Sequence, residues 1–160
     1  MTEIFPIVLN VGDEAPDFDL PRDGGGHVRL ADFGGKPLVL FFYPKDDTTA
    51  CTTESISFTA LKADFDKAGV AILGISPDTV KSHDKFIRKH ALSVPLASDG
   101  EKTMAMAYGI WREKSMYGRT YMGVVRSTFL IGADGRIARI WDKVKVAGHA
   151  EEVLAAAKEL

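Results

Sequence analysis

The sequence has a single cysteine, Cys51, among its 160 residues. One cysteine cannot close a disulfide within the chain, which excludes a disulfide-stabilised framework and is typical of proteins that work in a reducing cytosol. The Cys-x-x-Cys pair of dithiol reductases is excluded as well. Any redox chemistry at Cys51 must therefore be completed by another molecule.

Long apolar runs and a strong net charge are also absent. No segment approaches the roughly 18 apolar residues of a membrane span, and residues 1–10 lack the basic region and the small-residue cleavage site of a signal peptide. The net charge of −2 gives no basic field that would recruit nucleic acid or anionic lipid. We expect a cytoplasmic protein without a membrane or nucleic-acid partner, built as a single domain over residues 1–160.

Strands and helices are expected to alternate through the first two thirds of the chain. The glycines at 24–26 separate two short alternating stretches, which predicts an N-terminal β-hairpin. Continuous apolar runs at 38–43 and 70–75 predict strands buried on both faces. Apolar residues at helical spacing over 52–68 predict a helix that Gly69 ends. Further along we expect a helix that starts at Ser76–Asp78 and ends near His90, a short strand at 94–97 and helical turns over 101–109.

The last third of the chain predicts a second hairpin and a final helix. Segments 126–131 and 136–141 flank an Asp-Gly turn, and 151–160 is expected to be helical. Residues 110–123, rich in aromatic residues and methionine, are expected to form a long loop on the core, or alternatively to line a pocket entrance or a dimer surface. The element order predicts an α/β, thioredoxin-like fold, with a central mixed β-sheet flanked by helices and an N-terminal β-hairpin.

Cys51 lies where a predicted strand gives way to a predicted helix. Helix N-termini carry orphan amide protons and partial positive charge, and both favour a thiolate, which is the reactive form of cysteine. We expect Cys51 to precede the helix by about one residue and to take the cap position, with Glu54 three residues on as in a capping box. The alternative is an inert core cysteine. The polar residues on either side of Cys51 favour the reactive site.

The segment around Cys51 resembles the peroxiredoxin family. Pro44, Thr48 and Cys51 match the peroxiredoxin active-site pattern Pro-x-x-x-Thr-x-x-Cys, and the run CTTE at 51–54 is similar to the peroxiredoxin Q branch, also called bacterioferritin comigratory protein. The resemblance extends over nearly the whole chain. Three further segments that are similar to the family follow its order: 11–18, 74–78 and 126–131.

This resemblance implies a thiol peroxidase with an antioxidant role and no cofactor. Cys51 would be the peroxidatic cysteine, Thr48 would orient the peroxide and the thiolate, and Pro44 would shield the pocket from water. Arg126 would complete the pocket and hold the thiolate, because a guanidinium stays charged and offers several donors. Glu54 would pair with an arginine in this pocket and orient it. Taken singly, each of these partners is better explained as a strand-end, turn, cap or surface residue, and it is their occurrence together in order that favours the active site.

The sequence departs from the resemblance at the resolving cysteine. Many peroxiredoxin Q members carry it five residues after the peroxidatic one, where this chain has Ile56, and others carry it on the next helix, where 78–90 contains none. We therefore expect a one-cysteine mechanism in which Cys51 reacts with hydrogen peroxide or an organic hydroperoxide. An external thiol, from thioredoxin or from glutaredoxin with glutathione, would then restore it. We expect a monomer or a weak homodimer, and a Cys51–Cys51 disulfide would require two buried sites to meet.

Two other functions are compatible with the same fold. A redox sensor or a holdase chaperone on the same fold would also oxidise Cys51 but would not turn over with a reductant. A metal site is not expected, because no histidine has neighbouring ligands at a zinc spacing. The histidines are interpreted as surface or internally satisfied residues: His27, His83, His90 and His149.

Overall fold

A computed structural model describes residues 8–160 of the chain. The expectation that no signal peptide is present concerns residues 1–10, of which residues 1–7 lie outside this range. Within residues 8–160, no helix combines the length and the apolar character that crossing a membrane would require.

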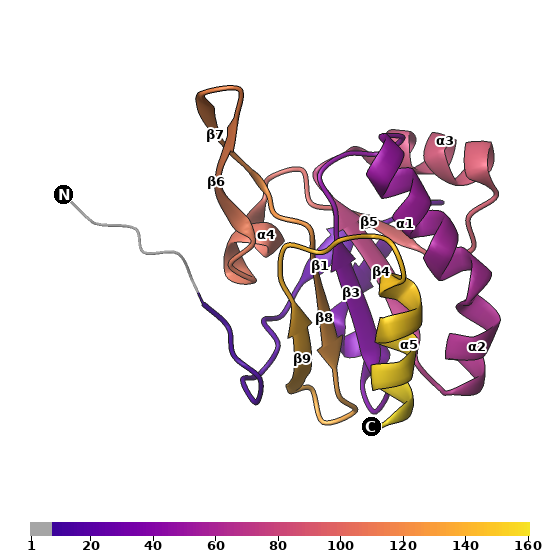
Figure 1. The fold of residues 1–160 in the computed structure, drawn as a ribbon. Coiled ribbons are helices and arrows are strands. Elements are labelled where there is room, and N and C mark those ends of the chain that lie inside the picture. Colours follow the sequence, from indigo (N-terminus) through magenta and orange to yellow (C-terminus); the bar gives the residue numbers. More distant parts are fainter. Residues whose placement is uncertain (1–7) are drawn as a thin grey trace.

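A five-stranded mixed sheet forms the centre of the molecule (Figure 1). Its order is β5-β4-β3-β8-β9, in which β3, β4 and β5 are parallel while β8 and β9 run antiparallel. The mixed sheet predicted from the sequence is therefore confirmed. The strands are β3 (Leu38–Phe42), β4 (Ala71–Ser76), β5 (Leu96–Ser98), β8 (Ser127–Ile131) and β9 (Ile137–Trp141).

Strand β3 is buried on both faces, and its side chains pack alternately into two separate hydrophobic cores. Val39 and Phe41 belong to one cluster together with Phe58 and Phe86 from the helices. Leu38, Leu40 and Phe42 point to the other cluster. Because both faces are covered, the strand reads as a continuous apolar run in the sequence.

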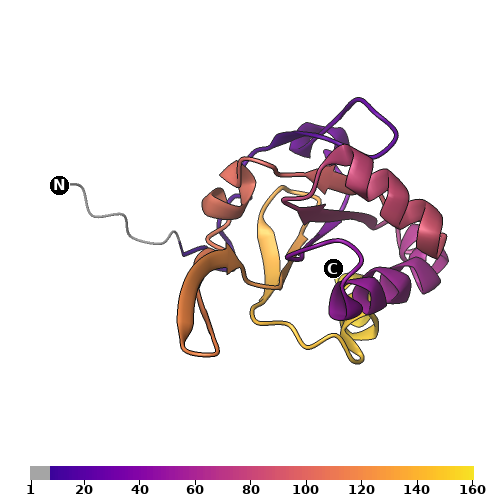
Figure 2. The same cartoon turned by 90° about the horizontal axis from the view of Figure 1, so that it is seen from above.

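Four helices cover the first face of the sheet and smaller elements cover the second (Figure 2). The first group is α1 (Thr49–Ala60), α2 (Lys62–Lys67), α3 (Val80–His90) and α5 (His149–Lys158). The second group is α4 (Thr103–Ala107), the 3-10 turn Leu30–Phe33 and the N-terminal hairpin of β1 (Asp19–Pro21) and β2 (His27–Arg29). The predicted N-terminal hairpin is confirmed.

Two helix boundaries differ from the prediction. The helix expected over 52–68 is two helices that begin at Thr49 and meet at Leu61, where the chain bends so that Phe58 and Phe65 both reach the core. Helix α3 is capped by Thr79 and not by Ser76–Asp78: the Thr79 hydroxyl accepts from the Ser82 amide at 3.1 Å. Threonine is among the residues preferred at N-caps, so Thr79 is an acceptable cap, although the prediction placed the helix start at Ser76–Asp78.

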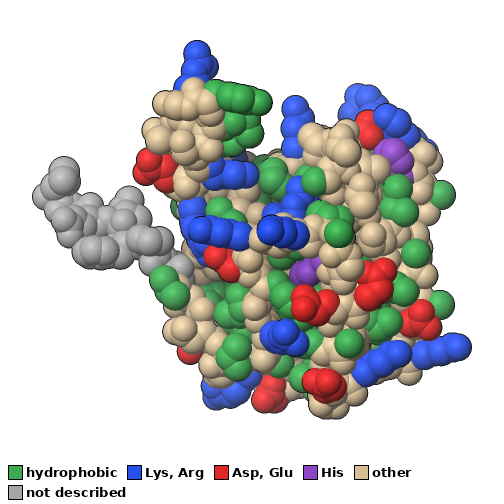
Figure 3. Space-filling model, viewed as in Figure 1, with side chains coloured by type: hydrophobic (Ala, Val, Ile, Leu, Met, Phe, Trp, Pro, Cys, Tyr) green, Lys and Arg blue, Asp and Glu red, His purple; other side chains and the backbone are tan. Residues whose placement is uncertain are grey.

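The segment expected as a loop on the core is a hairpin that stands away from it. Strands β6 (Trp111–Met116) and β7 (Arg119–Val124) pair around Tyr117-Gly118, and both turn residues have positive φ, as a type I′ turn requires. Four large side chains near the tip are exposed: Met116, Tyr117, Tyr121 and Met122. Figure 3 shows the hairpin rising beside a hollow in the upper surface, with Lys and Arg side chains along it. The expectation of a core-packed loop is therefore wrong.

Candidate active site

Cys51 lies in the first turn of α1, at the carboxyl end of β3. Thr48 is the N-cap residue, so Cys51 is the third helical residue. This differs from the prediction, which placed Cys51 itself at the cap. The helix begins earlier because Thr48 takes the extended backbone of a cap (φ −90°, ψ 157°). The Cys51 side chain is only 1% exposed. The thiol thus faces the interior from the end of the helix that favours an anion.

Arg126 approaches Cys51 from a different part of the chain. It directly precedes β8, whose Ser127 is paired with Phe42 at the end of β3. Because β8 runs antiparallel to β3, the start of β8 meets the end of β3, where α1 begins. The Arg126 Nη2 group donates to the Cys51 sulfur at 3.1 Å. A guanidinium at this distance in a buried setting stabilises negative charge on the sulfur.

Glu54 lies one turn further along α1 and binds the other side of Arg126. Its Oε1 accepts from Arg126 Nη1 at 2.7 Å, whereas its Oε2 is buried without a hydrogen-bond partner. Burial raises the pKa of Glu54 to about 7, although Arg126 opposes the shift. Burial also works against the charged guanidinium, but Glu54 and Cys51 outweigh it and raise the pKa of Arg126. The Glu54 carboxyl group is therefore paired with Arg126 and does not close a capping box with Cys51.

The other two expected site residues lie at the entrance to α1. The Thr48 hydroxyl donates to the Lys45 carbonyl oxygen at 2.8 Å and is exposed. Pro44 is half-buried in the loop between β3 and α1. The structure thus brings Cys51, Glu54 and Arg126 into one hydrogen-bonded group, and it places Thr48 and Pro44 on the loop that leads into that group.

A second polar group near the site was missed from the sequence. Asp46, two residues before Thr48, is buried and is hydrogen-bonded to His83 Nδ1 at 2.8 Å. Of the two expectations for His83, a surface or an internally satisfied histidine, the second is confirmed, because it is fully buried with both ring nitrogens hydrogen-bonded. The available signal was the position of His83 three residues before Phe86, on the apolar face of α3.

His149, at the start of α5, is buried near enough to Arg126 for the two side chains to interact electrostatically. Its Nε2 is hydrogen-bonded to the Thr128 hydroxyl at 2.8 Å, and its ring meets the rings of Phe58 and Trp141 edge-on. Burial lowers the pKa of His149 from 6.5 to about 4, and the nearby Arg126 charge contributes. The imidazole therefore stays uncharged at neutral pH.

This depressed pKa predicts an acid-sensitive contribution to stability. Below pH 6.5 the unfolded chain takes up a proton at His149 that the folded protein refuses until about pH 4, so the contribution is complete above pH 6.5 and is lost as the pH falls through that window. Urea unfolding would measure the free energy of unfolding at about pH 7.5 and about pH 5. We expect the decrease between these two values to be about 2 kcal/mol smaller in His149→Gln, which can still hydrogen-bond to Thr128. The exposed His27→Gln is the control. Equal slopes for His149→Gln and the wild type would contradict the assignment.

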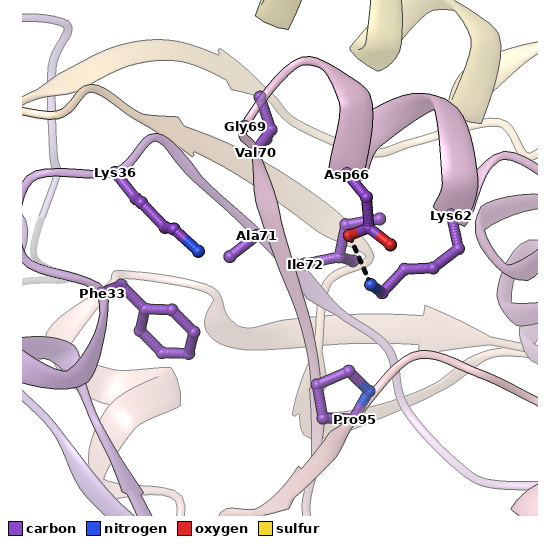
Figure 4. Close-up of a pocket in the computed structure, with 9 residues that line it drawn as sticks. All are labelled: Phe33, Lys36, Lys62, Asp66, Gly69, Val70, Ala71, Ile72 and Pro95. Atoms are coloured by element: carbon purple, nitrogen blue, oxygen red, sulfur yellow. Dashed lines mark hydrogen bonds and ion pairs between the residues drawn. The ribbon is translucent and has the colours of Figure 1, made fainter.

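No group of three or more metal-binding side chains occurs among residues 8–160. A pocket of about 210 Å³, shown in Figure 4, is lined by residues that precede β3, β4 and β5, including Lys36, Gly69 and Pro95. Because these strands are parallel, the pocket lies at the opposite edge of the sheet from Cys51. Lys62 in its wall is already paired with Asp66 at 2.6 Å. The pocket therefore takes no part in the thiol site.

The fold and the buried thiol–guanidinium pair define a class of thioredoxin-like thiol peroxidases, and comparison with known proteins bears this out. The AhpC/TSA family model matches residues 11–140. Peroxiredoxin Bcp of Xanthomonas campestris is 50% identical over 146 residues, which cover 90% of this chain and 91% of that protein. Peroxiredoxin Bcp of Escherichia coli is 40% identical over 151 residues, covering 94% and 97%.

Solved structures give the same assignment. Peroxiredoxin Q of X. campestris superposes with a TM-score of 0.85 at 48% identity and covers 89% of this chain and 90% of that one. A PrxQ variant of Xylella fastidiosa reaches a TM-score of 0.90 at 41% identity, covering 94% and 96%. The chain therefore belongs to the AhpC/TSA family of peroxiredoxins. It is a thiol-dependent peroxidase similar to the Bcp/PrxQ proteins, with one cysteine.

Proposed function

We propose that the protein reduces hydrogen peroxide and organic hydroperoxides by a one-cysteine cycle at Cys51. The observation that carries this proposal is the 3.1 Å hydrogen bond from Arg126 to the sulfur of a cysteine that is 1% exposed. The similar bacterioferritin comigratory protein of X. campestris has alkyl peroxide reduction activity, which supports hydroperoxides as substrates of this protein.

In the first step the Cys51 thiolate attacks one peroxide oxygen. An S–O bond forms and the O–O bond breaks, so the sulfur becomes sulfenic acid and the other oxygen leaves as water or an alcohol after it takes up a proton. Arg126 stabilises the negative charge as it passes from sulfur to the leaving oxygen. Thr48 would orient the peroxide, Pro44 would keep water out, and Glu54 would hold Arg126 in place.

In the second step an external thiol condenses with the sulfenic acid and releases water, which leaves a mixed disulfide on Cys51. A further thiol then attacks this disulfide and restores the Cys51 thiolate. The need for an outside thiol follows from the sequence, which has no other cysteine, and Ile56 stands exposed where many relatives of this branch resolve the intermediate. A cytoplasmic location would supply such thiols in reduced form.

The reductant is the open choice, between thioredoxin and glutaredoxin with glutathione. We expect steady-state peroxide consumption when one of these systems, with its own reductase and NADPH, is added to the wild-type protein. Ile56→Cys, on the exposed face of α1, provides a matched variant with a second thiol close to the site. Turnover of the wild type with one system identifies its partner. A single stoichiometric oxidation with neither system would contradict the catalytic cycle and favour a redox sensor.

A further inference from the structure

Two consecutive aspartates in the loop before α1 are both held by α3. Asp47 is exposed and accepts from Lys89 Nζ at 2.6 Å and from His90 Nε2 at 2.9 Å. Asp46 is buried, and His83 reaches it at 2.8 Å with side chains that are 4% and 0% exposed. Exposed ion pairs contribute little to stability. A buried pair is held in one geometry because no water is available to replace either partner. The buried contact is therefore the one that fixes the loop.

His83 is held at both ring nitrogens. Its Nδ1 faces the Asp46 carboxyl group at 2.8 Å, and its Nε2 faces the Ala97 carbonyl oxygen at 2.9 Å. The carbonyl can only accept, so Nε2 donates to it, and a single proton joins Nδ1 to the carboxyl oxygen. The ring therefore cannot turn without leaving buried polar atoms unpaired.

The Asp46 carboxyl group is held by three partners. It accepts from the Tyr43 hydroxyl at 2.6 Å and from the Ser82 hydroxyl at 2.8 Å, and it is also hydrogen-bonded to His83 Nδ1. Three partners on two oxygens fix the orientation of the carboxyl group. Burial raises the pKa of Tyr43 well above its ordinary value, with help from Asp46, which keeps the phenol as a donor.

A second carboxylate fastens the backbone of the same loop. Asp78, between β4 and α3, accepts from the Asp46 amide at 2.7 Å and from the Ser76 hydroxyl at 2.6 Å. Asp46 is thus held through both its side chain and its backbone. These contacts join the end of β3, the start of α3 and strand β5 at a point five residues before Cys51.

We propose that the buried Asp46–His83 hydrogen-bonded pair positions Cys51 for attack on the peroxide. Arg126 reaches the sulfur from β8, on one side of β3, whereas the pair fastens the loop to α3, on the other side. The first turn of α1 is suspended between these two anchors. The pair therefore sets the distance between the Cys51 sulfur and Arg126, and His83 and Asp46 are positioning residues. This proposal rests on the proposed peroxidase cycle and extends it.

The same pair slows the second half of the cycle, in which an external thiol reduces the oxidised Cys51. The Cys51 side chain is 1% exposed, so an external thiol can reach its sulfur only when the loop or the first turn of α1 moves. A tighter loop favours attack on a small peroxide, and a looser loop favours access by a thiol. Weakening the pair should therefore slow oxidation of Cys51 and accelerate reduction of its sulfenic acid. A residue that merely stabilises the fold would not produce these opposite changes.

The test is His83→Gln, which keeps one donor for Asp46 but removes the ring that joins Asp46 to the Ala97 carbonyl. Stopped-flow Trp fluorescence would follow oxidation by hydrogen peroxide and, separately, reduction of the oxidised protein by dithiothreitol. We expect oxidation to slow by about tenfold and reduction to become several-fold faster, because small displacements of a reacting group cost large factors in rate. Tyr43→Phe, which keeps the ring and removes only one donor to Asp46, should show the same changes with smaller size.

Two control variants separate positioning from stability. Tyr108→Phe removes a buried hydrogen bond to the Pro16 carbonyl, 2.7 Å long, on the other face of the sheet, and should lower the Tm without changing either rate. Lys89→Ala removes the exposed contact of the same helix and should also leave both rates unchanged. Folded His83→Gln and Tyr43→Phe proteins with wild-type rates would overturn the proposal. If the wild-type Cys51 itself fails to react with peroxide, the peroxidase cycle is wrong, and the positioning role is wrong with it.

Discussion

Replacing Cys51 by Ser is expected to reduce peroxide consumption to the uncatalysed background. A serine hydroxyl is not ionised at neutral pH, and its oxygen cannot accept the peroxide oxygen as sulfur does. The fold should survive, because Cys51 is packed among apolar neighbours and the smaller hydroxyl can still accept from Arg126. Peroxide loss in the presence of the active reductant system measures the effect, and circular dichroism verifies the fold.

The matched comparison for Cys51→Ser is labelling with dimedone, which traps sulfenic acid. The wild-type protein should gain one label after peroxide treatment, and the variant should gain none. Because the sequence has no other cysteine, a label on the variant could not arise from a second thiol. Retained peroxidase activity in Cys51→Ser would contradict the assignment of the reacting atom.

Replacing Arg126 by Ala should slow oxidation of Cys51 by about 10²- to 10³-fold, the loss typical when one buried donor to a developing charge is removed. The guanidinium lies 3.1 Å from the sulfur and is held there by Glu54. Arg126→Lys keeps the charge but loses the planar fork that reaches both partners, so we expect it to recover only part of the rate. Single-turnover oxidation by peroxide is the measurement.

Removing Arg126 also leaves the Glu54 carboxylate buried without its partner, which could destabilise the protein. The double variant Arg126→Ala with Glu54→Gln removes this unpaired charge and isolates the effect on the sulfur. Arg136→Ala serves as the control, because Arg136 is exposed and donates to the Gly12 carbonyl oxygen far from the site. Oxidation of the double variant at nearly the wild-type rate would show that Arg126 does not stabilise the transition state.

The sequence predicted the strands of the central sheet in their order along the chain. It also predicted the three residues that form one hydrogen-bonded group at the thiol, Cys51, Glu54 and Arg126, but not how they meet. Patterns along the chain identified the strands at 38–43 and 70–75 because burial on both faces makes them continuously apolar. The boundary of α1 was misplaced by three residues, since Thr48, Cys51 and their neighbours are all acceptable near a helix start. Cys51 therefore lies in the first turn of α1 and not at the predicted cap.

Contacts between distant segments escaped prediction for a different reason. Asp46 and His83 are 37 residues apart, and each taken alone reads as an ordinary polar residue. Their pairing depends on how α3 lies against the end of β3, which no local pattern records. The hairpin at 111–124 was missed because its charged and apolar residues face water on both sides, so the usual alternation of a half-buried strand is absent.

The central claim is that Cys51 becomes a sulfenic acid which only an outside thiol can resolve. Intact-mass measurement of the wild-type protein tests it directly, after one equivalent of peroxide and again after addition of glutathione. The account predicts a gain of one oxygen, then a glutathione adduct on the peptide that contains Cys51, and a return to the starting mass with excess thiol. An unchanged mass after peroxide, or an oxidised form that excess thiol does not reverse, would contradict it.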